Sequence, residues 1–148
     1  MNVCHRILTV LSFLCLSLNG CYRAESETVI DKTPFIIDDK GVIFQCNPPL
    51  VRRYNTATVR IGLKKDWRPE PPWNSIKFSD GTRVYVKCFL TGSNDKVYES
   101  NCLGMAGGEL DIRFDPPVPK KIGITQVKII TDAIIECTYV AWYDFQAK

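Results

Sequence analysis

The apolar run Ile7–Leu18 most constrains what this chain can fold into, because it has the form of an export signal. Basic side chains precede the run, and no acidic residue occurs before Glu25. The run is too short for a membrane-spanning helix, which needs about 20 apolar residues. We therefore expect residues 1–20 to be a signal peptide and the mature protein to be secreted, with no membrane span.

A second interpretation of the same region stays open. The segment Leu18–Cys21 resembles the cleavage box of bacterial lipoproteins, in which Cys21 would carry the lipid. On either interpretation, the polar residues 21–33 are expected to form a loose leader. Residues 34–148 are then expected to form a single domain, because their length suits one hydrophobic core.

Removal of the signal also removes the only histidine of the chain, His5. Serine, cysteine and acid–base hydrolases commonly use histidine as the base. We therefore expect that the mature chain is not an enzyme and has no cofactor. The formal net charge of the whole chain is +3, and loss of Arg6 lowers it to +2, which is too small to make the entire surface a polyanion binder.

Carboxylates offer the remaining route to hydrolysis. Glu109 and Asp111 stand two positions apart and would share one face of a strand. Such a pair could act as in a glycosidase, although two acids on a solvated face are the more common cause of this spacing. The glycine-rich residues 104–108 do not lead into a helix, so they predict a flexible loop instead of a phosphate-binding motif.

Four cysteines belong to the mature domain, namely Cys46, Cys88, Cys102 and Cys137. In an exported domain such a set predicts two disulfides. Three pairings are possible, and we favour Cys46–Cys137, which closes the two ends of the domain, with Cys88–Cys102, which closes a short loop. A zinc site does not fit, because no CxxC spacing and no histidine are present. We expect no metal.

The segment after Asn47 predicts a helix. Asparagine is a favourable N-cap, Pro48 suits the first turn, and apolar residues follow at helical spacing from Leu50 to Ile61. The other positions are basic, with no acid until Asp66. This basic face, with two tryptophans nearby to stack on bases, is the predicted binding surface for RNA. It consists of Arg52, Arg53, Arg60, Lys64, Lys65, Trp67 and Trp73.

Strand signals dominate the rest of the chain. Asp80-Gly81 is a strong hairpin turn, and the residues on both sides of it are of the β type. Residues 66–74 contain three prolines and predict an irregular segment. The predicted strands are 35–46 with a bend at 38–41, then 75–78, 82–90, 96–99, 109–114, 123–130 and 133–143, the last two at the centre of the sheet. The sum is an α+β domain, with one N-terminal helix packed on an antiparallel sheet.

The aromatic-x-Cys element Phe44-Gln45-Cys46, after a signal peptide and before a helix, strands and a late cysteine, resembles the ribonuclease-like candidate secreted effectors of powdery mildew fungi. The stretch 123–143 is similar to the paired central strands of microbial guanyl-specific ribonucleases, where the two strands lie side by side. The resemblance implies a microbial-ribonuclease-like fold with a Cys46–Cys137 disulfide. It also implies a pseudo-ribonuclease that has lost its catalytic residues.

The resemblance further implies a virulence function. Such proteins bind a host protein or host RNA to suppress plant defence, in or around the plant cell, and some are recognised by plant immune receptors. The leading hypothesis is therefore a monomeric, non-catalytic secreted effector. The alternative is a secreted or lipid-anchored all-β binding module of viral, parasite or bacterial origin. A strand in place of a helix after Asn47 would favour this alternative.

The leading hypothesis predicts that charge reversal at Arg52 and Arg53 weakens RNA binding and flattens its salt dependence, because fewer phosphate counterions are released. Binding by the mature domain at two salt concentrations, with cleavage followed in the same tube, measures both properties. Unchanged affinity would remove RNA as a partner, and cleavage above background would contradict a non-catalytic protein.

Overall fold

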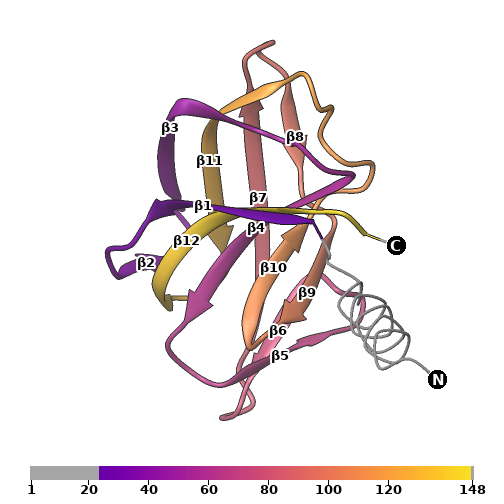
Figure 1. Cartoon of the computed structure of the whole chain (residues 1–148). Helices are drawn as coiled ribbons and strands as arrows, with labels where there is room; N and C mark the ends of the chain where they lie inside the picture. The colour runs from indigo at the N-terminus through magenta and orange to yellow at the C-terminus, as the bar shows by residue number, and fades with distance from the viewer. Residues whose placement is uncertain (1–23, 148) are drawn as a thin grey trace, which may run out of the picture.

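The computed structural model describes residues 24–147, which form two antiparallel β-sheets around one hydrophobic core (Figure 1). The predicted signal peptide and Cys21 lie outside these residues. The strands are β1 (Glu25–Asp31), β2 (Phe35–Ile37), β3 (Val42–Val51), β4 (Thr56–Leu63), β5 (Trp67–Glu70), β6 (Ser75–Phe78), β7 (Arg83–Gly92), β8 (Val97–Glu99), β9 (Cys102–Ala106), β10 (Glu109–Arg113), β11 (Gly123–Thr131) and β12 (Ile135–Phe145).

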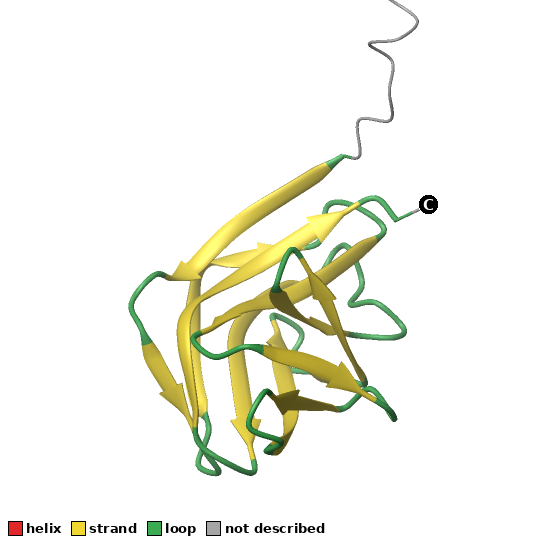
Figure 2. Cartoon of the chain, turned by 90° about the horizontal axis from the view of Figure 1, so that it is seen from below, coloured by secondary structure: helices red, strands yellow, loops and turns green. Residues whose placement is uncertain are grey.

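Each sheet contains six strands. In the first, sheet A, the order is β1-β12-β4-β10-β9, and β2 also pairs with β12. In the second, sheet B, the order is β3-β11-β7-β6-β5, and β8 also pairs with β7. Strands β1 and β3 are therefore edge strands of different sheets. Figure 2 shows strands and loops but no helix within residues 24–147.

The predicted α+β, ribonuclease-like fold is therefore wrong, because the expected helix is replaced by strands β3 and β4. In β4 the side chains alternate, which is the period of a strand and not of a helix. Ala57, Val59 and Ile61 are buried in the core between the sheets, whereas Thr58 and Arg60 lie on the opposite, outer face of sheet A. The β-branched residues of this segment favour the strand and outweigh the helical spacing of its apolar residues.

The expected helix start at Asn47-Pro48 is an irregular section of the edge strand β3. Leu50 pairs with Ile124 and Gln45 pairs with Gln126 of β11, so the pairing is interrupted between these positions. Proline has no N–H to donate and is tolerated in a strand mainly at an edge or a bulge. The prolines therefore shape the edge of sheet B.

Several predicted strands are confirmed. The hairpin at Asp80-Gly81 joins β6 and β7, with Gly81 at a φ of 89°. Strands β11 and β12 are also present, but they do not pair with each other as the resemblance implied. Their connection crosses between the sheets, and its backbone N–H groups at Thr131 and Asp132 donate to Asp38 and Tyr85 of other segments.

Besides β4, three strands were not predicted. Residues 25–31, expected in a loose leader, form β1 beside β12, so the beginning and the end of the described chain lie side by side (Figure 1). Residues 67–70, expected to be irregular, form β5 at the edge of sheet B. Residues 102–106 form β9, and the expected glycine loop shrinks to a turn at Gly107-Gly108.

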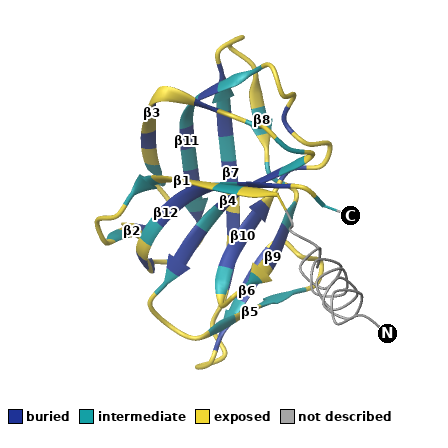
Figure 3. Ribbon diagram, viewed as in Figure 1, coloured by how far each residue is buried: buried dark blue, intermediate teal, exposed yellow. Residues whose placement is uncertain are grey.

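Both sheets direct aliphatic side chains into the shared core. Ile61, Leu110 and Ile112 of sheet A and Leu90 and Ile129 of sheet B are completely buried. Burial of one such side chain stabilises the fold by about 1.5–3 kcal/mol. Figure 3 shows this burial along β4, β10 and β12, while the loops at both ends are exposed. The core holds the two sheets together without covalent links.

The predicted disulfides are wrong, because all four cysteines of the described chain are free thiols. Cys88 points into the core from sheet B, whereas Cys102 lies on the outer face of sheet A opposite Arg113. Burial raises the pKa of Cys46 to about 11 and of Cys137 to about 12, and it raises the pKa of Cys88 further. These side chains act as small apolar core residues.

We predict that alkylation with iodoacetamide at pH 8 modifies Cys102 first, because its side chain is partly exposed. Cys88 should be modified last, because a buried thiol with a raised pKa forms little thiolate. Mass spectrometry of the labelled peptides measures the order, and the denatured protein, in which all four react alike, is the control. A peptide pair joined by a disulfide would contradict the structure.

Candidate functional site

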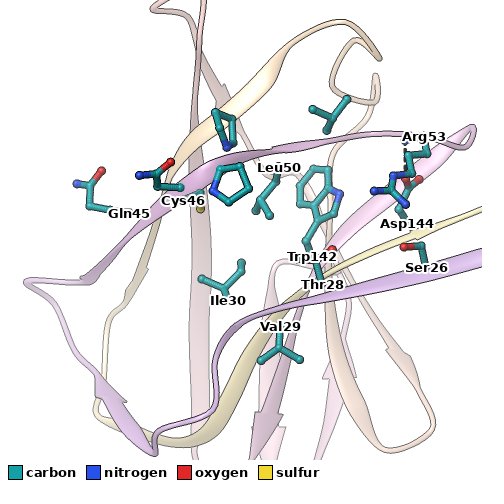
Figure 4. A pocket seen from close by; sticks show the side chains of 14 residues that line it. Ser26, Thr28, Val29, Ile30, Gln45, Cys46, Leu50, Arg53, Trp142 and Asp144 are labelled. Atoms are coloured by element: carbon teal, nitrogen blue, oxygen red, sulfur yellow. Dashed lines mark hydrogen bonds between the residues drawn. The ribbon is translucent and has the colours of Figure 1, made fainter.

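A pocket of about 300 Å³ lies between the edge strands β1 and β3 (Figure 4). This volume is at the lower end of the range for small-molecule sites. Trp142 of β12 forms its base. The walls around it are formed by Ser26, Thr28, Ile30, Cys46, Asn47, Pro48, Pro49, Leu50, Arg53 and Asp144, among others.

Strand alternation determines which side chains of β1 reach the pocket. Thr28 and Ile30 point to the inner side of β1 and Val29 between them points to the outer side, and all three line the pocket (Figure 4). Thr28 pairs with Trp142, and the outward Glu27 pairs with Tyr143, so the two neighbouring strands keep the same inner face. Because β1 is an edge strand, no further strand of sheet A lies beyond it, and the pocket lies between this edge and β3.

The facing wall comes from the interrupted section of β3. Pro48 and Pro49 present apolar rings there, and Leu50 adds a buried aliphatic side chain beside them. The two prolines remove backbone donors from this edge, so a further strand cannot pair along it in full. The pocket therefore stays a side-chain pocket and is not a template for strand addition.

Trp142 carries the most unusual polar atom of the pocket. The residue is 2% exposed, and its indole Nε1 has no hydrogen-bond partner in the described part of the chain. An unpartnered buried donor costs about 1–3 kcal/mol. The indole nitrogen can only donate, so the group that is missing is an acceptor. In Figure 4 this nitrogen lies on the side of the ring that faces Arg53.

Asp144 and Arg53 form the polar end of the pocket. Asp144 is buried, and its carboxylate accepts hydrogen bonds from the backbone N–H groups of Arg53 and Tyr54, the latter at 3.0 Å. The Arg53 side chain is exposed, and its guanidinium has no ion pair or hydrogen bond with any residue from 24 to 147. At this end of the pocket, the Asp144 carboxylate thus accepts two hydrogen bonds, whereas the Arg53 guanidinium and the Trp142 indole Nε1 donate none within residues 24–147.

The residues predicted to form one basic surface are spread over the molecule, because they do not share a helix face. Arg53 alone lines the pocket between β1 and β3. Arg52 instead holds loops together, with its guanidinium donating to the carbonyl oxygens of Val118 at 2.6 Å, Tyr54 at 3.2 Å and Asn55 at 2.5 Å. Charge reversal at Arg52 would therefore disturb the fold as well as any RNA contact.

The other members lie at the far ends of the strands. Lys64 forms an exposed ion pair with Glu136 at 3.0 Å, and Lys65 is exposed beside it. Trp67 is half-buried against the core, so only part of its ring could stack on a base. Trp73 is 49% exposed in the β5–β6 turn, with a φ of 68°.

Arg60 lies on the outer face of sheet A within a charged cluster. Its Nε and Nη2 donate to both carboxylate oxygens of Asp111, at 2.8 and 3.2 Å. Glu27 lies 3.7 Å from the guanidinium, which stacks 3.6 Å above the ring of Tyr143. Since Asp111 is 2% exposed, Arg60 neutralises a buried charge and is not free to bind phosphate.

Glu109, the second acid of the predicted carboxylate pair, lies on the same outer face. Burial raises its pKa, and the negative charges of Glu27 and Asp111 raise it further against the opposing effect of Arg60. Its Oε2 is buried without a partner in the described chain. Both acids lie on the face of sheet A opposite to Trp142, so neither can act on a molecule held in the pocket.

Most residues of the pocket were not predicted from the sequence. Arg53 was selected, but as part of a helix, and no signal singled out Trp142 or the residues of β1. Trp142 and Asp144 alternate with Tyr143 along β12. Their side chains, which can both form hydrogen bonds, therefore lie on the inner face of this strand. Their shared pocket depends on pairing with β1, which lies at the other end of the chain.

Comparison with protein-family models, with curated proteins and with solved structures finds no match to this chain. Among residues 24–147, no helix is long and apolar enough to cross a membrane. In the same range, no group of three or more His, Cys, Asp or Glu side chains could hold a metal ion. The pocket must therefore be interpreted from its own chemistry.

We predict that Arg60→Met lowers the free energy of unfolding by about 3 kcal/mol, because it leaves the buried Asp111 carboxylate unpaired. Lys64→Met breaks an exposed ion pair and should cost less than about 1 kcal/mol. Urea denaturation of both variants measures the difference. The double variant Arg60→Met/Asp111→Leu should recover most of the loss, and equal effects of the two single variants would contradict this assignment.

We also predict that Glu109→Gln stabilises the protein at pH 7. A pKa raised by folding means that the folded state binds the proton more tightly, so this group favours folding at low pH and the benefit is lost as the pH rises through the raised pKa. The stabilisation by Glu109→Gln should therefore vanish near pH 4, where Glu109 is protonated in the wild type. Urea denaturation at both pH values tests this, with the exposed Asp39→Asn as control.

Proposed function

We propose that this chain is an exported, non-catalytic binding module that holds a small, partly apolar molecule between β1 and β3. The observation that carries the proposal is the unpartnered Nε1 of Trp142 in a residue that lines this pocket. Four side-chain atoms are buried without a partner among residues 24–147, and Trp142 Nε1 is the one of these four whose residue lines the pocket. A ligand that accepts a hydrogen bond would satisfy this atom.

The all-β fold supports this proposal over the effector hypothesis. That hypothesis rested on a ribonuclease-like arrangement with a helix, and the corresponding residues form β3 and β4. The alternative stated from the sequence was an all-β binding module, and it was expected to gain if the segment after Asn47 is a strand. Export and the lack of catalysis remain supported by the signal-like residues 1–20 and by the loss of His5.

RNA is a less favoured partner than a small molecule. Arg52 and Arg60 donate their guanidinium hydrogen bonds to groups within the fold, and Lys64 is paired with Glu136. A nucleic-acid surface needs several free cations along one path. The predicted basic residues supply only isolated free cations, whereas the pocket brings the hydrogen-bond donors of Arg53 and Trp142 to one place.

We predict that the neutral fluorescent probe N-phenyl-1-naphthylamine binds the protein with one saturable site. Thr28→Phe should weaken this binding by about tenfold or more, because the new ring fills the pocket from β1. Ile43→Phe is the control, since Ile43 is 52% exposed in β3 and does not line the pocket. Fluorescence titration measures both affinities, and equal affinities would remove the pocket as the binding site.

A further inference from the structure

The two ends of the pocket differ in chemistry, and this difference selects among the ligands that the proposed binding function allows. At one end, Trp142 offers its unpartnered Nε1–H and Arg53 offers an unpaired guanidinium, both on the same side of the indole ring in Figure 4. The hydroxyl of Ser26 lies at this end as well. Two of these three groups can only donate.

The acceptor at this end is already engaged. Both oxygens of the Asp144 carboxylate accept backbone N–H groups, from Arg53 and from Tyr54. Each oxygen thus keeps one hydrogen bond within the fold, whereas the Arg53 guanidinium has no partner among residues 24–147 and is the unpaired charge at this end. An incoming group at this end therefore finds donors that lack acceptors, which favours a carboxylate over an ammonium group.

The other end of the pocket has no charged side chain, and the amides of Gln45 and Asn47 are its polar groups. Ile30 enters from β1 and Leu50 faces it from β3, and Pro48 also lines the pocket. A volume of about 300 Å³ restricts the ligand to a small molecule. The wall residues offer no charged group here, so this end suits a short aliphatic chain, whose burial would be favourable.

We propose that the pocket binds a small aliphatic carboxylate. The carboxylate oxygens accept hydrogen bonds from the Trp142 indole and the Arg53 guanidinium, and the alkyl chain lies between Ile30 and Leu50. This assignment depends on the proposed binding function and adds the chemical class of the ligand. It accounts for the buried indole donor and for the unpaired arginine at the same time.

Competition with N-phenyl-1-naphthylamine tests the proposal on the whole purified protein at pH 7. The competitors are octanoate, octanol and octylamine, which share a chain and differ in the head group. Octanoate should displace the probe at a concentration about tenfold or more below that of octanol, as expected for one charge-assisted hydrogen bond. Arg53→Gln should remove this advantage while leaving octanol unchanged.

Two further variants test whether the advantage of octanoate comes from this pocket. Lys65→Gln removes an exposed cation away from this pocket, so the advantage of octanoate should persist in it. Trp142→Phe keeps the ring and removes the donor, and it should also lower the affinity for octanoate. Because Arg53 is exposed, Arg53→Gln is expected to fold even if Trp142→Phe does not.

The outcomes separate the two proposals. If octanol and octanoate displace the probe equally, or if octylamine is the best competitor, the carboxylate assignment is overturned while the binding pocket stands. The carboxylate assignment is also overturned if Lys65→Gln abolishes the advantage of octanoate over octanol as Arg53→Gln does. The advantage would then come from the overall charge of the protein and not from this pocket. If the probe does not bind at all, the proposed function itself falls.

Discussion

The pairing of β12 with β4 on one side and with β1 on the other is the interaction on which the rest of this molecule depends. It places the last strand inside sheet A and brings residues from the beginning of the described chain beside it. The backbone ladder fixes which side chains of β12 face the core, because a shift of one residue would reverse both faces. Trp142 and Asp144 face inward for this reason, and Tyr143 faces the cluster around Arg60.

The sequence indicated most of the strands but not their assembly. The alternation of Val84, Val86 and Cys88 marks a half-buried strand unambiguously, as does the turn at Asp80-Gly81. The segment from Leu50 to Ile61 is ambiguous, because its apolar residues fit a helical period as well as a strand period. The β-branched residues at positions 56, 58 and 59 were the better guide, and two prolines that suit a helix start also suit an edge strand.

The candidate site was harder to foresee than the fold. A pocket between two sheets depends on which strands become edges, and this follows from pairings between distant parts of the chain. Strand β1 is rich in polar residues and carries no strong strand signal, so its role beside Trp142 appears only in three dimensions. The disulfide prediction failed for a related reason. The presence of four cysteines is explained as well by burial in the apolar parts of two different sheets as by oxidation to disulfides.

The position of β12 has a consequence for how the protein is made. Sheet A cannot be completed before residue 145 has been synthesised, because β1 and β4 both pair with β12, whose last residue is Phe145. Contacts of such high sequence separation form late and make folding slow. Until β12 is available, the chain cannot close its core, and an incompletely folded polypeptide is the form that can be threaded through a narrow translocation channel.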